Sequence, residues 1–322
     1  MGVEYNHSII DSSTWWLKET KGATLFNKFI LSSIKVIYLG SRFLLKLALG
    51  KKRRDRIYVQ KGINFKDFLY KSLKFLGMYN FALVEIYVSK YNYKACCRLN
   101  KEDIIASTIH EDLMLDYFTP KQGDVVVDLG ANIGRYAIIA SRRVGTNGKV
   151  IAIEAHPRNC EIINRNIKLN GLNNVIALNY AAYSKETKLR LYTPDEELGY
   201  TMHHSIMFNY LSPRFNMEKE EGKYVEVNAN TLDNLLEQNG IRPENVNWIK
   251  IDVEGAEYEV LRGAHNVLSN SNDLTLIIEV HGSNNNNKYK SIIELLDLYH
   301  FKIKFEKTYV GGDVYKHVIL RK

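Results

Sequence analysis

A short apolar run, a glycine-containing turn and a downstream acid form the first group of residues that could do chemistry in this sequence. The run Val125–Val127 is too short for a helix and is typical of a buried parallel strand. The turn at 128–134 follows it, a helical pattern begins at Arg135, and a second apolar run, 149–153, ends at Glu154. A strand, a glycine turn, a helix, a strand and a terminal acid together predict a nucleotide-binding βαβ unit.

The turn contributes Asp128, Gly130, Asn132 and Gly134 as candidate ligand-binding residues. Glycines let the backbone approach a ligand and leave the amides at the helix start able to donate. Glu154, at the end of the second strand, could accept hydrogen bonds from both hydroxyls of a ribose. The dinucleotide pattern GxGxxG is excluded because Asn and Arg replace two of its glycines, and no Gly-Lys-Ser/Thr ending indicates a phosphate loop. The spacing D-x-G-x-x-x-G instead resembles motif I of class I S-adenosylmethionine-dependent methyltransferases.

A second group of acids, with one histidine, follows two later apolar runs. Asp252 and Glu254 come after Trp248–Ile251, while Glu279 and His281 end the run that begins at Leu274. The carboxyl ends of parallel strands share one edge of a sheet, so we expect these side chains to lie near the first turn. His281 is the expected general base because its ordinary pKa lies near neutrality, with Asp252 and Glu254 as competitors.

Other roles for the second group stay open. Asp252 could hold the ammonium group of the donor, Glu254 could cap the next helix, and His281 could be a structural turn residue. The three acids and His281 could also bind a divalent cation that lowers the pKa of an acceptor, although we expect no metal.

The two groups together resemble the FkbM-type methyltransferase family. The resemblance rests on VVVDLGANIG and WIKIDVEGAEYEVLRGA, with TLDNLL between them and LIIEVHG after them, and it covers about residues 105–305. It implies S-adenosylmethionine as the methyl donor and a hydroxyl acceptor on a sugar, polyketide or similar metabolite. Family positions carry over to this chain at the donor turn (Asp128, Gly130, Asn132, Gly134), the ribose acid (Glu154), the DVEG motif (Asp252, Glu254) and the E-x-H motif (Glu279, His281).

The expected fold is a Rossmann-like class I α/β domain with a mostly parallel, seven-stranded sheet that ends in an antiparallel hairpin. We predict a basic N-terminal helical extension (1–56), an α/β cap region (57–118) and an S-adenosylmethionine-binding domain (119–322). Alternating patterns predict one hairpin over 84–99 and an inserted hairpin from 189–192 and 224–227. The sequence also predicts a helix over 104–118 and a third core strand over 175–180 that ends at 181–182. We expect the insert to lie near the mouth of the ligand pocket, where acceptor specificity would be set.

The net charge of +8 belongs to the N-terminal segment. Residues 1–61 contain 12 Lys and Arg against 4 acids, and the remaining 32 bases are balanced by 32 acids. Residues 26–50 predict a helix with one narrow polar stripe, followed by the basic cluster 51–54. This helix could lie on an anionic membrane or pack on the domain, whereas its charges oppose a full span. The three cysteines follow no disulfide or zinc pattern, so we expect the protein to be in the reducing cytoplasm. Residues 26–56 are the candidate site of contact with the membrane.

Two other functions compete with methylation of a small-molecule or glycan acceptor. A nucleic-acid methyltransferase would agree with the basic pI of about 9.1, but the excess of bases is confined to the N-terminal segment and no Pro-Pro signature of amino-group methylation occurs. A non-catalytic, membrane-tethered binding module would not need the intact acids Asp128, Glu154 and Asp252. The sequence does not indicate an oligomeric state.

Overall fold

The computed structural model describes residues 83–98, 100–108, 112–194, 201–207, 223–281, 286–310 and 314–322. The predicted extension at 1–56 and its amphipathic helix lie outside these residues. The chain divides into two compact units, residues 1–104 and 105–322. Within the described residues, no helix is long and apolar enough to cross a membrane.

In the first unit, the described residues form the predicted hairpin. Strand β1 (Leu83–Val88) pairs antiparallel with β2 (Tyr93–Arg98) across a single 3₁₀ turn at Ser89–Tyr91. The turn closes at Asn92, which has φ 52°, a left-handed conformation that asparagine tolerates well. At the end of β2, the fully buried Arg98 side chain is neutralised by Asp103 at 2.8 Å.

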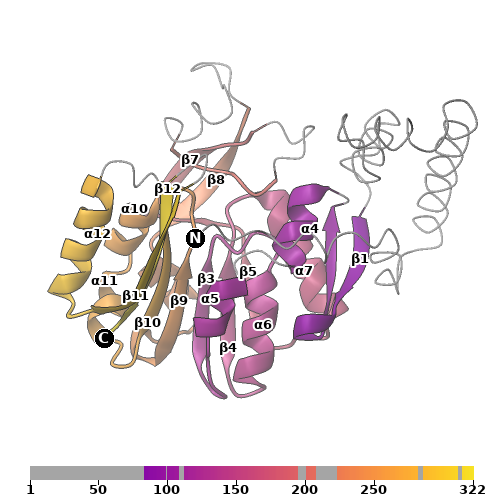
Figure 1. Ribbon diagram of the computed structural model, residues 1–322, viewed down its shortest axis with the longest axis horizontal. Helices are drawn as coiled ribbons and strands as arrows, with labels where there is room; N and C mark the ends of the chain where they lie inside the picture. The colour runs from indigo at the N-terminus through magenta and orange to yellow at the C-terminus, as the bar shows by residue number, and fades with distance from the viewer. Residues whose placement is uncertain are drawn as a thin grey trace, which may run out of the picture. The chain divides into compact units, whose positions relative to one another are not determined.

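The second unit is built on a seven-stranded sheet with the order β11-β12-β10-β9-β3-β4-β5 (Figure 1). Each of the pairs β5–β4, β4–β3, β3–β9 and β9–β10 is parallel, while β12 runs antiparallel to both β10 and β11. This arrangement confirms the predicted fold class, including the terminal antiparallel hairpin. The strands are β3 (Val125–Leu129), β4 (Lys149–Ile153), β5 (Val175–Leu178), β9 (Val246–Ile251), β10 (Thr275–His281), β11 (Lys302–Val310) and β12 (Val314–Arg321).

Helices lie on both sides of this sheet, with α6 and α7 on one side and α10 to α12 on the other (Figure 1). Their bounds are α6 (Arg135–Val144), α7 (Pro157–Leu169), α9 (Leu232–Gln238), α10 (Glu257–Arg262), α11 (His265–Asn270) and α12 (Asn286–Leu298). Val127 and Leu129 of β3 pack in one core with buried residues of α9 to α12. Side chains alternate along a strand, so Asp128 points to the opposite face. There, Lys250 lies over the ring of Tyr136 on α6, 4.9 Å from its centroid.

A second, three-stranded sheet has the order β6-β8-β7. Strands β7 (Thr187–Tyr192) and β8 (Tyr224–Asn230) pair antiparallel, as predicted for the inserted hairpin. The short strand β6 (Ala181–Ala182), predicted as the end of the third core strand, pairs instead with β8. The core strand therefore ends at Leu178, and the insert begins earlier than the sequence pattern suggested.

Two helical predictions differ from the structure. The helix predicted over residues 104–118 appears as α4 (Lys101–Thr108) and α5 (Asp112–Tyr117), with 109–111 outside the described residues. Helix α11 was not predicted. Its first amides, those of Asn266 and Val267, donate to the carboxylate of Asp233 on α9, so a residue distant in sequence supplies the cap.

Gly130 joins the ends of β3 and β9 so closely that no side chain fits there. Its φ is +71°, and a Cβ atom would lie 1.7 Å from the backbone oxygen of Asp252. Gly171 has a similar φ of +63°, but a Cβ atom there would have no neighbour within 4 Å, which makes Gly171 a matched control.

We expect Gly171→Ala to lower the free energy of unfolding by about 1–2 kcal/mol, the cost of left-handed backbone alone. Gly130→Ala should lose about 1–3 kcal/mol more, because the strands must separate to admit the methyl group. Urea unfolding of both variants measures the difference. Equal losses would show that the close approach at Gly130 contributes nothing.

Candidate functional site

The turn after β3 is fixed by backbone hydrogen bonds to both neighbouring strands. The amides of Gly130 and Ala131 donate to the carbonyl oxygen of Ile153 at the end of β4. On the other side, the amide of Asp252 donates to the carbonyl oxygen of Leu129 at 3.0 Å. The predicted donor turn therefore lies between the strand that leads to Glu154 and the strand that leads to Asp252.

Glu154 is held against this turn by two amide donors. The N–H of Asn132 donates to its Oε2 and the N–H of His156 to its Oε1, both at 2.8 Å. Burial raises the pKa of Glu154, and the hydrogen bond from the His156 amide acts in the opposite direction. Each carboxylate oxygen has two lone pairs, so two hydroxyl donors could still bind. Asn132 adopts the left-handed φ of 52°, and Gly134 forms the N-cap of α6 at φ 90°.

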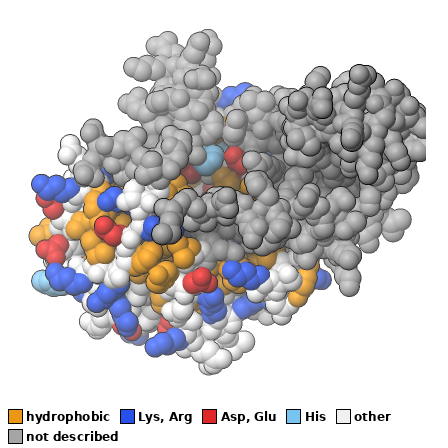
Figure 2. All heavy atoms as spheres, viewed as in Figure 1, with side chains coloured by type: hydrophobic (Ala, Val, Ile, Leu, Met, Phe, Trp, Pro, Cys, Tyr) orange, Lys and Arg blue, Asp and Glu red, His pale blue; other side chains and the backbone are white. Residues whose placement is uncertain are grey.

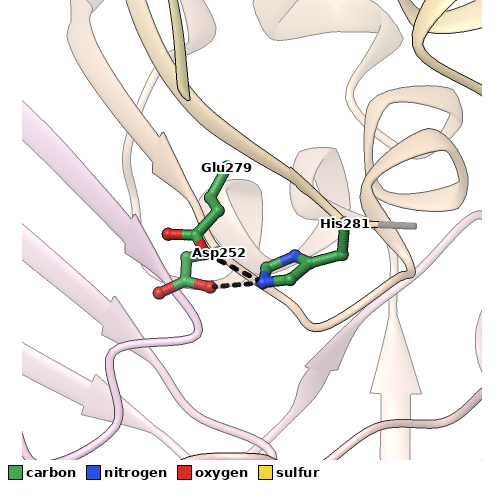
Figure 3. A group of neighbouring side chains, drawn as sticks. All are labelled: Asp252, Glu279 and His281. Carbon is green, nitrogen blue, oxygen red and sulfur yellow. Dashed lines mark ion pairs between the residues drawn. The ribbon is translucent and has the colours of Figure 1, made fainter. Parts of the chain in front are cut away.

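The acids after β9 and the two polar residues of β10 meet at the same sheet edge, as predicted. His281 Nε2 lies 3.1 Å from Glu279 Oε1 and 3.8 Å from Asp252 Oδ1, and these three side chains point toward one another (Figure 3). Glu254 Oε2 is 3.6 Å from the same nitrogen. One ligand atom from each of Asp252, Glu279 and His281 falls within 4.8 Å of the others, so this set could hold a metal ion.

Glu257 was not predicted to belong to the site, yet it holds the other nitrogen of His281. Its Oε1 is 2.8 Å from His281 Nδ1 and also accepts the Gly255 amide at 2.8 Å. Its Oε2 pairs with Lys288 Nζ at 2.6 Å. Glu257 has no exposed surface, which makes these charged partners necessary. The sequence could have indicated this role, because Glu257 is the last acid of the DVEGAE stretch and lies in the first turn of α10.

Lys250 is a second residue that sequence reasoning missed. Its Nζ donates to Asp252 Oδ2 at 3.0 Å and lies 3.9 Å from Asp128 Oδ1. Lys250 is only 4% exposed and Asp128 only 1%. A buried lysine between two carboxylates compensates one of the two negative charges and fixes the direction of the Asp252 side chain. Because Lys250 sits within an apolar strand, its sequence position gave no sign of this role.

The environment of His281 favours its protonated form. Burial alone would lower the pKa of His281, but the charges of Glu254 and Glu279 and the hydrogen bonds to Glu257 and Glu279 raise it well above its ordinary value. A protonated imidazole cannot accept a proton, so this arrangement counts against His281 as the base and favours Asp252 or Glu254. Glu257 responds in the opposite sense: burial would raise its pKa, but His281 and Lys288 lower it.

The insert reaches both parts of this edge. His203 Nδ1 lies 3.0 Å from Glu254 Oε1, and the ring of His204 stacks on that of His156 with centroids 4.2 Å apart. Ser205, which bridges to Tyr192 of β7, fastens the segment to the small sheet. His203 thus contacts Glu254, the acid after β9, and His204 contacts His156, whose amide donates to Glu154. This supports the prediction that the insert lies beside the site.

Sequence comparisons place the chain among methyltransferases. The family model "Methyltransferase FkbM domain" matches residues 128–303, more than half of the chain, and a model for protein-L-isoaspartate(D-aspartate) O-methyltransferase matches 56–182. Methyltransferase sdnD of Sordaria araneosa is 26% identical over 196 residues, covering 55% of this chain and 74% of that protein. Methyltransferase 1 of Beauveria bassiana is 28% identical over 170 residues, covering 48% and 66%.

Solved structures show more distant likeness. A methyltransferase FkbM from Methylobacillus flagellatus KT matches with a TM-score of 0.41 and 14% identity, over 61% of this chain and 43% of that one. The tRNA m1G37 methyltransferase of M. jannaschii matches with a TM-score of 0.42 and 12% identity, over 74% and 56%. This chain thus spans about half the length of these two structures.

Protonation of His281 predicts a pH dependence of stability. A histidine whose pKa is raised on folding stabilises the fold fully below its unfolded pKa, about 6.5, and this contribution is lost as pH rises through the folded pKa. The difference in unfolding free energy between wild type and His281→Gln should therefore be largest at pH 6 and shrink by pH 9. Urea unfolding in EDTA-containing buffers measures it. A difference that stays constant or grows with pH would contradict the raised pKa.

Proposed function

Because this chain belongs to the FkbM methyltransferase family, we propose that it transfers a methyl group from S-adenosylmethionine to a hydroxyl oxygen of a sugar, glycan, lipid-linked or other small-metabolite acceptor. The observation that carries the proposal is the meeting of two acid groups at one sheet edge. Glu154 is tied to the donor turn through Asn132, and Asp252 is tied to the same turn through Leu129. In an open parallel sheet this edge is where ligands bind.

The residues of the turn fit the proposed donor. Glu154 is a buried acid with acceptor capacity for the ribose hydroxyls, and Gly130 leaves no side chain between the ends of β3 and β9. Asp252, beside Gly130, would face the amino-acid end of the donor. When bound, S-adenosylmethionine supplies a methyl group on a positively charged sulfur. The protein's task is then to align an acceptor oxygen with that methyl group.

The acceptor proton needs a destination at the same edge. Asp252 is the candidate best placed to receive it, since its Oδ1 faces the cluster while Lys250 holds its Oδ2. Glu254, which contacts His203, is the alternative. His281 would then act as a positioning cation that orders the carboxylates around it. His281 could act as the base instead only if it lost its proton when the donor or the acceptor binds to the protein.

We also propose that the protein works in the cytoplasm, with residues 26–56 as its contact with an anionic membrane surface. The basic cluster and the narrow polar stripe of that segment support this. A nucleic-acid acceptor is less well supported. On the face shown in Figure 2, Lys and Arg side chains are scattered among acidic and apolar ones and form no basic patch in the described residues.

Donor binding tests the first half of the proposal. Isothermal titration of the purified protein with S-adenosylmethionine should show binding at one site, and Glu154→Gln should weaken it about tenfold or more through loss of charge-assisted hydrogen bonds worth about 1.5–3 kcal/mol. Glu161→Gln, an exposed acid on α7, is the matched control and should bind as the wild type does. Unchanged affinity in Glu154→Gln would reject the ribose assignment.

Methyl transfer tests the second half. Incubation with methyl-labelled S-adenosylmethionine and separated glycan, lipid, small-metabolite and RNA fractions should label one of the first three. Asp252→Asn should reduce that labelling about 10²–10⁴-fold, the usual contribution of a general base. Labelling of RNA would identify a nucleic-acid methyltransferase. Donor binding without transfer to any fraction would favour a non-catalytic module.

A further inference from the structure

The side chains of Asp252, Glu279 and His281 share a feature that proton transfer does not require. Each turns one polar atom toward the other two, and each has its remaining polar atom held by a partner outside the set. Figure 3 shows the inward atoms converging from the end of β9 and from β10.

The outward atoms are fixed by three different residues. Lys250 Nζ holds Asp252 Oδ2 at 3.0 Å, and His317 Nε2 contacts Glu279 Oε2 at 2.8 Å. Glu257 Oε1 contacts His281 Nδ1 at 2.8 Å, with Lys288 holding the other oxygen of Glu257. Metal ligands characteristically have such outer partners, and a carboxylate on the far nitrogen of a histidine is one of the recurring kinds.

From this geometry we propose that Asp252, Glu279 and His281 form a binding site for a divalent cation that accepts mixed oxygen and nitrogen ligands, such as Mn²⁺. The separations suit one ion. Ligands about 2.1 Å from an octahedral ion lie about 3 Å apart when adjacent and about 4 Å apart when opposite. The separation from Nε2 to Glu279 Oε1 is 3.1 Å, which matches adjacent positions, and that to Asp252 Oδ1 is 3.8 Å, between the adjacent and opposite values. All three atoms lie within 4.8 Å of one another.

Burial and charge support the same site. The side chains of Glu279 and His281 are 11% and 4% exposed, whereas that of Asp252 is 18% exposed. An ion there would be shielded on the β10 side and open on the side of Asp252, where water or an acceptor oxygen could complete its coordination. A set of two carboxylates and one imidazole favours Mn²⁺ over Ca²⁺, which takes six to eight oxygen ligands.

The ion would also take part in the proposed methyl transfer. Only this catalytic role, and not the binding site itself, rests on the proposed function. A hydroxyl bound to a divalent cation has a lowered pKa and is held in a fixed direction. The ion would displace the proton from His281 Nε2 to solvent, and His281 would then serve as a neutral ligand whose Nδ1 stays on Glu257. Both the pKa and the position of the acceptor hydroxyl would be set at the edge formed by β9 and β10.

The site can be tested without the acceptor or the donor. The full-length protein is treated with EDTA, dialysed and titrated with Mn²⁺, with free Mn²⁺ followed by electron paramagnetic resonance. We expect one bound ion per chain and a nitrogen coupling from His281 in the pulsed spectrum. Glu279→Gln should abolish saturable binding, and Glu257→Gln, which removes only an outer partner, should weaken it about 10–100-fold. Asp273→Asn is the control, an exposed acid paired with Arg321 ahead of β10, and should bind as the wild type does.

The outcomes separate this proposal from the proposed function. Absence of saturable Mn²⁺ binding in the wild type overturns the cation site, as does binding that Glu279→Gln and Glu257→Gln leave unchanged. Circular dichroism and thermal melts of each variant show whether it is folded, and the nitrogen coupling in the wild type is an independent readout that needs no variant. A protein that binds S-adenosylmethionine but not Mn²⁺ would reject only the proposed cation site. A protein that binds Mn²⁺ but not S-adenosylmethionine would reject only the proposed methyl donor.

Discussion

The carbonyl oxygen of Asp252 lies where the side chain of any residue but glycine would stand at position 130. This close approach, together with the hydrogen bond from the Asp252 amide to Leu129, holds the ends of β3 and β9 in contact. The donor turn and the DVEG turn are therefore parts of one rigid junction. Without it, Glu154 and the carboxylates after β9 would belong to separate sites.

Buried charge adds a second constraint to the same junction. Lys250 bridges Asp128 of β3 and Asp252 after β9, and the ring of Tyr136 covers it from α6. Removal of Lys250 would leave these two carboxylates without its compensating positive charge, a costly change for buried groups. The residues that position the site thus also stabilise the packing of α6 on the sheet. Stability and function here depend on the same contacts.

Local patterns in the sequence were sufficient for most strands of the large sheet and for the edge at which the acids meet, while the topology of the whole sheet came from the family resemblance. Parallel strands carry continuous apolar runs, and their carboxyl ends share one edge, so Asp252 and His281 could be placed without coordinates. Contacts between distant segments were not accessible in this way. Helix α11 is capped by Asp233 from α9, and β6 pairs with β8 of the insert. Each depends on a partner that no local period reveals.

The same distinction applies to the chemistry of His281. The ordinary pKa of histidine lies near neutrality, which suggested that His281 is a base. A base role also depends on the charges around the ring, and four carboxylates lie within 3.8 Å of its nitrogens. Such a shell demands a positive charge at Nε2, either a proton or a cation. Both alternatives remove His281 from the role of proton acceptor in the arrangement described. In the proposed reaction, the acceptor's proton would then pass to a carboxylate that remains accessible, and Asp252 and Glu254, the more exposed members of the shell, meet that condition.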